Sequence, residues 1–196
     1  IGTNALLNNN GNSNTGIGAS ALITNTTGAD NVGVGFGALI LNSVSNQNTA
    51  IGNYSLNGTT SGNNVGVGYF AGASNTTGSN NTFIGTFANA SGAAFTNATA
   101  IGASASVGQS NALILGNNAD VGIGISTPAE RLHVVGNIRI AGQNGLKITE
   151  GANATMGIAT MVAGTVVVAT NKVTANSRIF LTIQVPGGVV GSPYIS

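Results

Sequence analysis

The side chains that could carry out acid–base, nucleophilic or metal chemistry are few in this 196-residue chain. Histidine occurs once, at His133, and cysteine does not occur. One histidine cannot build a catalytic triad or a multi-histidine metal site within one chain, and a chain without thiols has no disulfides or thiolate sites. We expect His133 to pack or to form a hydrogen bond. The alternative is a trimer in which three copies of this imidazole face the axis and hold an ion.

The acidic side chains are equally sparse. They are Asp30, Asp120, Glu130 and Glu150. A glycosidase needs two carboxyl groups facing one bond, and these acids lie in separate segments, so only acids from different subunits could form such a pair. We interpret all four as solvated or salt-bridged surface groups. The sequence thus predicts no catalytic, metal-binding or cofactor-binding residues and no cofactor, leaves receptor-binding residues unassigned, and indicates that the protein is not an enzyme.

Two repeated patterns imitate known binding motifs. Val-Gly-Val-Gly at 32–35 and 65–68 looks like a nucleotide-binding loop, but it precedes no predicted helix and has counterparts in the other repeats, so we interpret both copies as strands. A threonine column consists of Thr15, Thr49, Thr82 and Thr99. Such a column could order water as in ice-binding β-rolls, but Val32 and Val65 interrupt it.

Composition excludes several classes of protein. Charged residues make up 5% of the chain and hydrophobic residues 42%, with a formal net charge of +1 and no cluster of Lys and Arg. Nucleic acid is therefore not an expected partner, and disorder is not expected either, since it requires high charge and low hydrophobicity. The longest apolar stretch, 156–169, is shorter than the ~20 residues of a spanning helix, so we expect no membrane insertion. Solubility is expected to come from Asn, Thr and Ser.

Most of the chain that carries these side chains consists of a short repeat. A β-branched residue followed by glycine recurs at steps of 16 or 17 residues. The pairs are Ile1-Gly2, Ile17-Gly18, Val34-Gly35, Ile51-Gly52, Val67-Gly68, Ile84-Gly85 and Ile101-Gly102. A period this short predicts one coil of a β-solenoid per repeat, stable only when it stacks on its neighbours.

Each coil is predicted to begin with a short strand, such as 14–18 and 48–52, in which a small residue lies on one side and its two neighbours on the other, and another backbone or subunit approaches closely at the small residue. Phe83 is an unexplained exception at that position. We expect Gly and Asn to supply the positive φ of the tight corners, and Ile, Val, Leu and Ala, with Phe36, Tyr54 and Phe70, to form the interior.

A leucine column comprises Leu6, Leu22, Leu39 and Leu56, and it ends where Gly72 takes the next position. Because the core of so narrow a coil is thin, we predict a parallel homotrimer that buries these leucines between subunits.

Specific residues carry a resemblance to known families. Asn-Thr-Ala-Ile-Gly at 48–52, Ile-Gly-x-x-Ala-Leu at 17–22 and the corner Asn-Thr-Thr-Gly-Ser-Asn-Asn at 75–81 resemble the head repeats of trimeric autotransporter adhesins and similar repeats in bacteriophage tail fibres. The last step shortens to 14 residues, from Ile101 to Leu115, and 103–111 resembles the adhesin repeat most closely. The resemblance covers residues 1–118.

The segments that follow differ in kind. Residues 121–138 are similar to a Gly-Ile-Gly-x-x-x-Pro stretch that joins shaft to C-terminal part in phage and viral fibre proteins, and Glu130 and Arg131 are available there for salt bridges. Beyond residue 146, β-rich segments and a Pro-Gly-Gly turn at 186–188 predict a small antiparallel domain. Its pattern resembles a domain at the tip of phage tail fibres. We expect residues after Ser196, or other subunits, to complete it, and coils to precede Ile1 in a longer polypeptide.

The sequence thus predicts an all-β protein with a β-solenoid (β-roll) shaft of 16–17-residue coils at 1–118, a parallel homotrimer, followed by a neck at 119–145 and a small antiparallel β tip domain at 146–196. The resemblance implies a structural and adhesive fibre of a virion, extracellular, whose tip attaches to a host cell-surface glycan or protein. Other fibre or baseplate proteins are the implied partners besides its own copies. A bacterial trimeric surface adhesin is the alternative, and a tailspike-like glycosidase is the third hypothesis.

Overall fold

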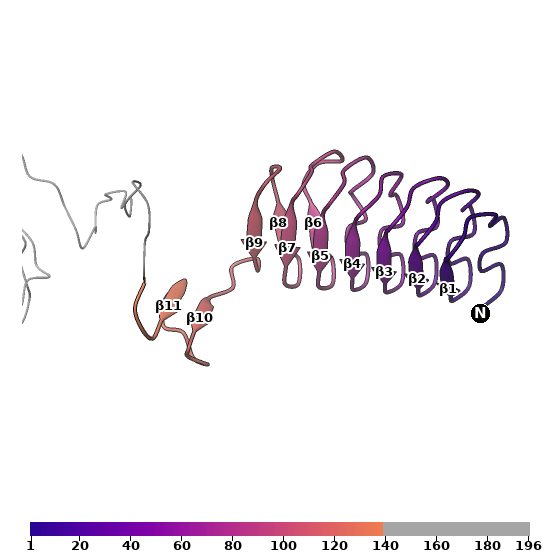
Figure 1. Ribbon diagram of the computed structural model, residues 1–196. Coiled ribbons are helices and arrows are strands. Elements are labelled where there is room, and N and C mark those ends of the chain that lie inside the picture. Colours follow the sequence, from indigo (N-terminus) through magenta and orange to yellow (C-terminus); the bar gives the residue numbers. More distant parts are fainter. Residues whose placement is uncertain (139–196) are drawn as a thin grey trace, which may run out of the picture. The chain divides into compact units, whose positions relative to one another are not determined.

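The computed structural model describes residues 1–138, and this part of the chain is all β and has no helix (Figure 1). The end of the predicted neck and the whole predicted tip domain lie outside the described residues. The strands are β1 (Thr15–Ile17), β2 (Val32–Val34), β3 (Thr49–Ile51), β4 (Val65–Val67), β5 (Thr82–Ile84), β6 (Asn89–Ala90), β7 (Thr99–Ile101), β8 (Ser106–Val107), β9 (Leu113–Leu115), β10 (Val121–Ile123) and β11 (Leu132–Val134).

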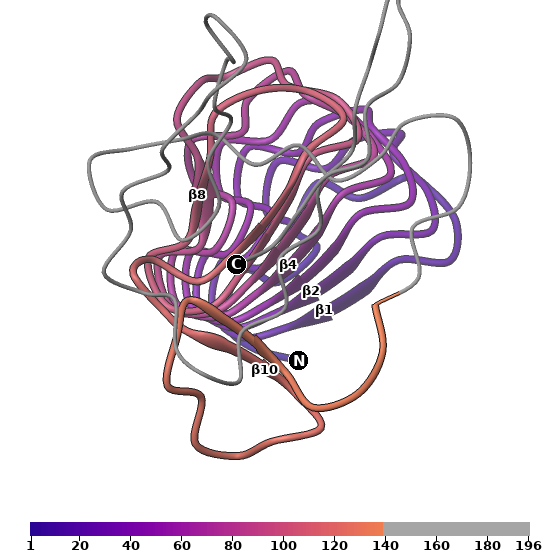
Figure 2. The ribbon, with the colours of Figure 1, turned by 90° about the vertical axis from the view of Figure 1, so that its left-hand side faces the viewer.

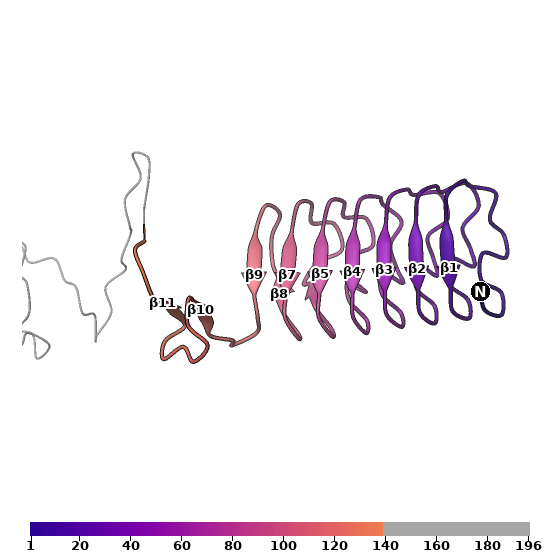
Figure 3. The same cartoon turned by 60° about the horizontal axis from the view of Figure 1, so that its bottom comes forward.

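Seven of these strands form one parallel sheet in the order β1-β2-β3-β4-β5-β7-β9. Each strand pairs with the strand one coil further along the chain, so that Ile17 lies opposite Val34 and Ile84 opposite Ile101. The strands stand in a single row (Figure 3), and successive coils overlie one another when viewed along the stack (Figure 2). The predicted parallel β-solenoid is therefore confirmed.

The shortened last coil keeps this register. Strand β7 pairs with β9 so that Ile101 lies opposite Leu115, although only 14 residues separate them. A second, two-stranded parallel sheet joins β6 to β8, and a third joins β10 to β11 within the predicted neck.

The glycine after each β-branched residue lies where two coils touch. These seven glycines have φ between +118° and +147°, a region that L side chains rarely adopt. A Cβ atom placed on Gly18 would stand 2.6 Å from the carbonyl oxygen of Gly35, and one on Gly85 would stand 2.6 Å from that of Gly102. We call these seven residues the anchor glycines. Because the anchor glycine of each coil contacts the anchor glycine of the next coil, the glycine recurs with the period of the coil.

The leucine column points into the solenoid. Leu22, Leu39 and Leu56 are fully buried within the single chain, so the prediction that they are buried between subunits is wrong. The middle residues of β1, β2 and β4 face the leucine column from across the coil. A Cβ atom on Gly33 would lie 3.3 Å from Leu22 Cγ, so the leucine, rather than another subunit, keeps that position small.

Phe83 finds its explanation in the same interior. It is fully buried, and it belongs to the coil in which Gly72 replaces the leucine. A Cβ atom on Gly72 would lie 2.7 Å from Phe83 Cδ2. The large and the small residue have exchanged places across this coil, an arrangement that preserves the packed volume.

Asparagines form a second column, which we call the asparagine ladder; its first member is half-buried and the others are buried. Its members are Asn14, Asn31, Asn48, Asn64 and Asn81. Each side-chain oxygen accepts a hydrogen bond from the backbone N–H of the next member, as Asn48 Oδ1 does from Asn64 N at 3.0 Å. Ala98 N closes the series by donating to Asn81 Oδ1 at 2.8 Å. These asparagines provide hydrogen-bond acceptors for backbone N–H groups inside the solenoid. The prediction that asparagine serves solubility is therefore wrong for these residues.

Candidate functional site

His133 lies in the middle of β11, half-buried, and its Nδ1 atom accepts a hydrogen bond from the backbone N–H of Ala129 at 3.1 Å. This bond ties the strand to the turn that precedes it. Within residues 1–138, no group of three or more His, Cys, Asp and Glu side chains is placed to hold a metal ion. The idea of an ion on a trimer axis stays a hypothesis.

The acidic residues are not brought together in the described part of the chain. Asp30 occupies a tight corner with φ 58°, where it stands in place of the predicted Gly or Asn. Asp120 forms a salt bridge with Arg131 at 3.0 Å, and Arg131 also donates to the carbonyl oxygen of Asn118. Both charged side chains are exposed, so the pair contributes at most about 1 kcal/mol. Glu150 lies outside the described residues.

The seven-stranded sheet presents an apolar surface to solvent, which we call the outer sheet face. The middle residue of each strand points inward, and its two neighbours point out. One outward column is Ile17, Val34, Ile51, Val67, Ile84, Ile101 and Leu115. The other is Thr15, Val32, Thr49, Val65, Thr82, Thr99 and Leu113.

The exposure of this face corrects the predicted interior. Ile51 is 43% and Ile84 39% exposed, although both were expected inside with the leucines. A coil of this width accommodates one column of large side chains, and the leucines and Phe83 occupy it. A continuous apolar stripe on a surface is typical of a surface that binds another molecule, so the outer sheet face is the first candidate site.

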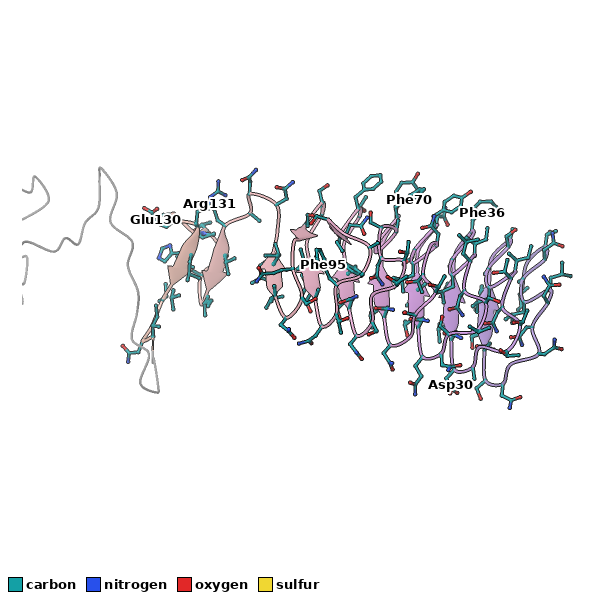
Figure 4. The ribbon with its side chains drawn as sticks, turned by 90° about the horizontal axis from the view of Figure 1, so that it is seen from above. Asp30, Phe36, Phe70, Phe95, Glu130 and Arg131 are labelled. Atoms are coloured by element: carbon teal, nitrogen blue, oxygen red, sulfur yellow. The ribbon has the colours of Figure 1, made fainter. Side chains whose placement is uncertain are left out.

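A row of aromatic side chains makes the second candidate site. It consists of Phe36, Tyr54, Tyr69, Phe70 and Phe87, and we call it the aromatic ladder. The residues follow the anchor glycines after β2 to β5, and Phe36 and Phe70 project from one edge of the solenoid (Figure 4).

The aromatic ladder also corrects the predicted interior, in which Phe36, Tyr54 and Phe70 were expected. Phe36 is 44%, Tyr69 46% and Phe87 51% exposed, while Tyr54 and Phe70 are half-buried. Sequence reasoning missed the ladder because large aromatic residues are usually assigned to a core. The available signal was their place next to the anchor glycines, on the turn that leaves each strand.

A protein-family model matches the C-terminal part of the chain. Residues 153–196 match the model of the C-terminal domain of a K1 capsule-specific polysaccharide lyase. The match spans less than a quarter of the chain and lies outside the described residues. It is to a phage tail-associated family, which is consistent with a phage fibre and with a virion component. No curated protein and no solved structure matches the chain.

This match overturns one prediction. The sequence indicated that the protein is not an enzyme, but its C-terminal segment is similar to a domain of a polysaccharide lyase, which points to an enzyme-related tailspike. The prediction failed because it rested on sparse acid–base side chains within a single chain. Among residues 1–138, no helix is long and apolar enough to cross a membrane.

Proposed function

We propose that the chain is part of a phage tailspike or tail fibre directed at a bacterial surface polysaccharide. The observation that carries this proposal is the combination of a parallel β-solenoid with a segment similar to the C-terminal domain of a capsule-specific polysaccharide lyase. The solenoid serves as the shaft, and the C-terminal segment belongs to the part that meets the host. Other fibre or baseplate proteins hold the shaft on the virion.

The shaft is a homotrimer in this proposal, and the outer sheet face is its subunit interface. Support comes from the apolar column from Ile17 to Leu115, whose isoleucines and terminal leucine the single chain leaves exposed. Three copies related by one axis along the shaft would cover these columns with one another, and every rung would meet the equivalent rung. The interface is thus the opposite of the one expected from the sequence, because the leucines are already buried within the chain.

Cleavage of the polysaccharide is the second candidate function, and the lyase match favours it. A lyase breaks a carbon–oxygen bond by elimination and leaves a carbon–carbon double bond in the product, whereas a hydrolase adds water and leaves none. An adhesive fibre binds the chain and releases it intact. The three outcomes are distinguishable on one sample.

The test has two parts. Antibodies against the shaft should label the tail of purified virions; labelling of a bacterial envelope instead would support a surface adhesin and contradict the proposal. Purified protein should then bind capsular polysaccharide from a host strain, and chromatography and ultraviolet absorbance should report whether the polymer is shortened and whether double bonds form. A protein that neither binds nor shortens the polysaccharide of any host strain would also contradict it.

A further inference from the structure

Three of the five residues of the aromatic ladder have an unfavourable backbone conformation. Tyr54, Phe70 and Phe87 have φ of 55°, 52° and 56°, in the left-handed region that Asn and Gly tolerate best. The corresponding position in other coils holds small or polar residues. They are Asn4, Ser20, Gly37 and Ser104. The backbone conformation therefore does not require an aromatic side chain at this position. An aromatic residue with a positive φ costs conformational energy, and some other interaction must offset that cost.

Burial is not a sufficient reason. The leucines of the interior, such as Leu39 with φ 54°, are also left-handed, but they are fully buried and fill the core. Of the strained ladder residues, Phe87 is 51% exposed, and Tyr54 and Phe70 are half-buried. A residue that accepts backbone strain without gaining full burial is a candidate for function.

The rings form one continuous surface across four coils. The ring of Tyr54 is stacked on that of Phe70 at 5.0 Å between centroids, and Phe70 is stacked on Phe87 at 6.0 Å. Tyr69 stands edge-on to Phe70 and Phe87, and Phe36 edge-on to Tyr54 at 5.1 Å. The row is therefore held in one arrangement before any ligand arrives, which lowers the entropy lost on binding.

The chemistry of the surface narrows the class of ligand. Asp30 is the only charged side chain before Asp120, and it lies on a different edge of the solenoid from Phe36 and Phe70 (Figure 4). An uncharged surface does not suit nucleic acid, whose binding needs cationic side chains. Tyr54 and Tyr69 add hydroxyl groups to the surface, and a phenolic hydroxyl can both donate to and accept from a ligand.

We propose that the aromatic ladder is a binding platform for a glycan chain that lies along the shaft. The C–H faces of sugar rings carry partial positive charge and pack against the electron-rich surfaces of aromatic rings, while tyrosine hydroxyl groups bond sugar hydroxyls. A repeating ligand meets a repeating surface, so several weak contacts act together. The choice of a glycan as the ligand rests on the proposed function, because the match to a polysaccharide lyase domain is the reason for expecting a polysaccharide.

The first experiment measures binding of host capsular polysaccharide to the full chain by calorimetry. The double variant Tyr69→Ser with Phe87→Asn removes two exposed rings and places at position 87 a residue that suits its φ. We expect about tenfold weaker binding, with oligomeric state and melting temperature retained. The matched control is Val44→Ser, which removes an exposed apolar side chain outside the ladder and should leave affinity unchanged.

A second measurement uses the unmodified ladder. The chain has no tryptophan and three tyrosines, two of which belong to the ladder. In a Tyr194→Phe protein, tyrosine fluorescence therefore reports on Tyr54 and Tyr69 alone. We expect the emission to change as polysaccharide is added.

The outcomes separate the two proposals. Wild-type binding that is equally strong in the double variant, together with constant emission, would overturn the platform and leave the proposed function standing. Loss of oligomerisation in the double variant would also overturn it, by assigning the ladder to a subunit interface. Failure of the wild-type protein to bind any host polysaccharide would overturn both.

Discussion

The anchor glycines set the closest approach between coils. At Gly85 the backbone has φ of 131°, and there is no room for a methyl group between it and Gly102. Any side chain at such a position must change its own φ and push the next coil away. These residues limit the sequences that can form the stack more strongly than the apolar columns do.

A Gly85→Ala substitution should therefore destabilise the protein strongly, by about 3 kcal/mol or more. Denaturant unfolding followed by circular dichroism measures the change. The control is Gly108→Ala, because a Cβ atom there meets only Ser91 Oγ at 3.7 Å. Similar unfolding midpoints for the two variants would show that the anchor column is not a tight contact.

Gly72 and Phe83 should compensate for each other, because the large and the small residue are exchanged between these two positions. Gly72→Leu alone should clash with Phe83, and Phe83→Gly alone should leave a cavity costing about 3–5 kcal/mol. The double variant restores the arrangement of the other coils and should be more stable than either single variant. Thermal unfolding of the four proteins gives the coupling energy, and additive effects would contradict the compensation.

Single residues also mark the limit of sequence-based reasoning. The recurring glycine and β-branched pairs predicted the coil length and the register, since both follow from the period alone. The period did not reveal which column faces inward, because Leu39 and Ile51 are both large and apolar and a strand has two faces. Nor could composition reveal that Asn48 is buried, since an amide is polar wherever it lies.

The candidate sites were less predictable than the fold. The aromatic ladder is built by five residues on four coils, and its exposure depends on Leu39 and Leu56 having already filled the interior. Phe83 and Gly72 are separated by 11 positions and make sense only as a pair across one coil. Contacts of this kind need the three-dimensional stack.

At the scale of the element, the asparagine ladder joins coils by side chains as well as by strand pairing. Asn48 illustrates its role, because its Oδ1 atom accepts from both the backbone N–H and the side chain of Asn64, at 3.0 and 3.2 Å. All of these groups are buried. If a buried N–H group of Asn64 lost its acceptor, no water molecule could reach it to accept the hydrogen bond instead.

Asn48→Ala should accordingly cost about 1–3 kcal/mol, since it leaves the buried N–H of Asn64 without an acceptor. Hydrogen exchange of the Asn64 amide should accelerate in the same variant. Asn53→Ala is the matched control, because Asn53 Oδ1 accepts from the exposed N–H of Phe36 at 3.1 Å, where water can take over. Equal costs for both variants would refute a special role of the ladder.

At the scale of the whole molecule, the proposed trimer forms through the outer sheet face. Its exposed isoleucines lie on β1, β3, β5 and β7, with valines on β2 and β4 between them, so a partner that covers the isoleucines covers the whole row. A positive charge at the centre of such a face would be brought close to its own copies on assembly. Like charges buried without partners oppose association strongly.

The double variant Ile51→Lys with Ile84→Lys should therefore convert trimers into monomers, as measured by sedimentation or light scattering. Leu41→Lys places a charge on an exposed apolar position outside the sheet and should leave the trimer intact. A wild-type protein that is monomeric, or a double variant that remains trimeric, would remove the sheet face as the subunit interface.

Because each rung pairs with the next in the same way, the number of coils in such a solenoid can change. Removing or duplicating one whole coil, from one anchor glycine to the residue before the next, leaves every remaining backbone contact of the same type. Recombination between similar repeats would then lengthen or shorten the rod in increments of about 4.8 Å without a new folding problem. In the proposed fibre, the length of the shaft is thus adjustable in discrete steps.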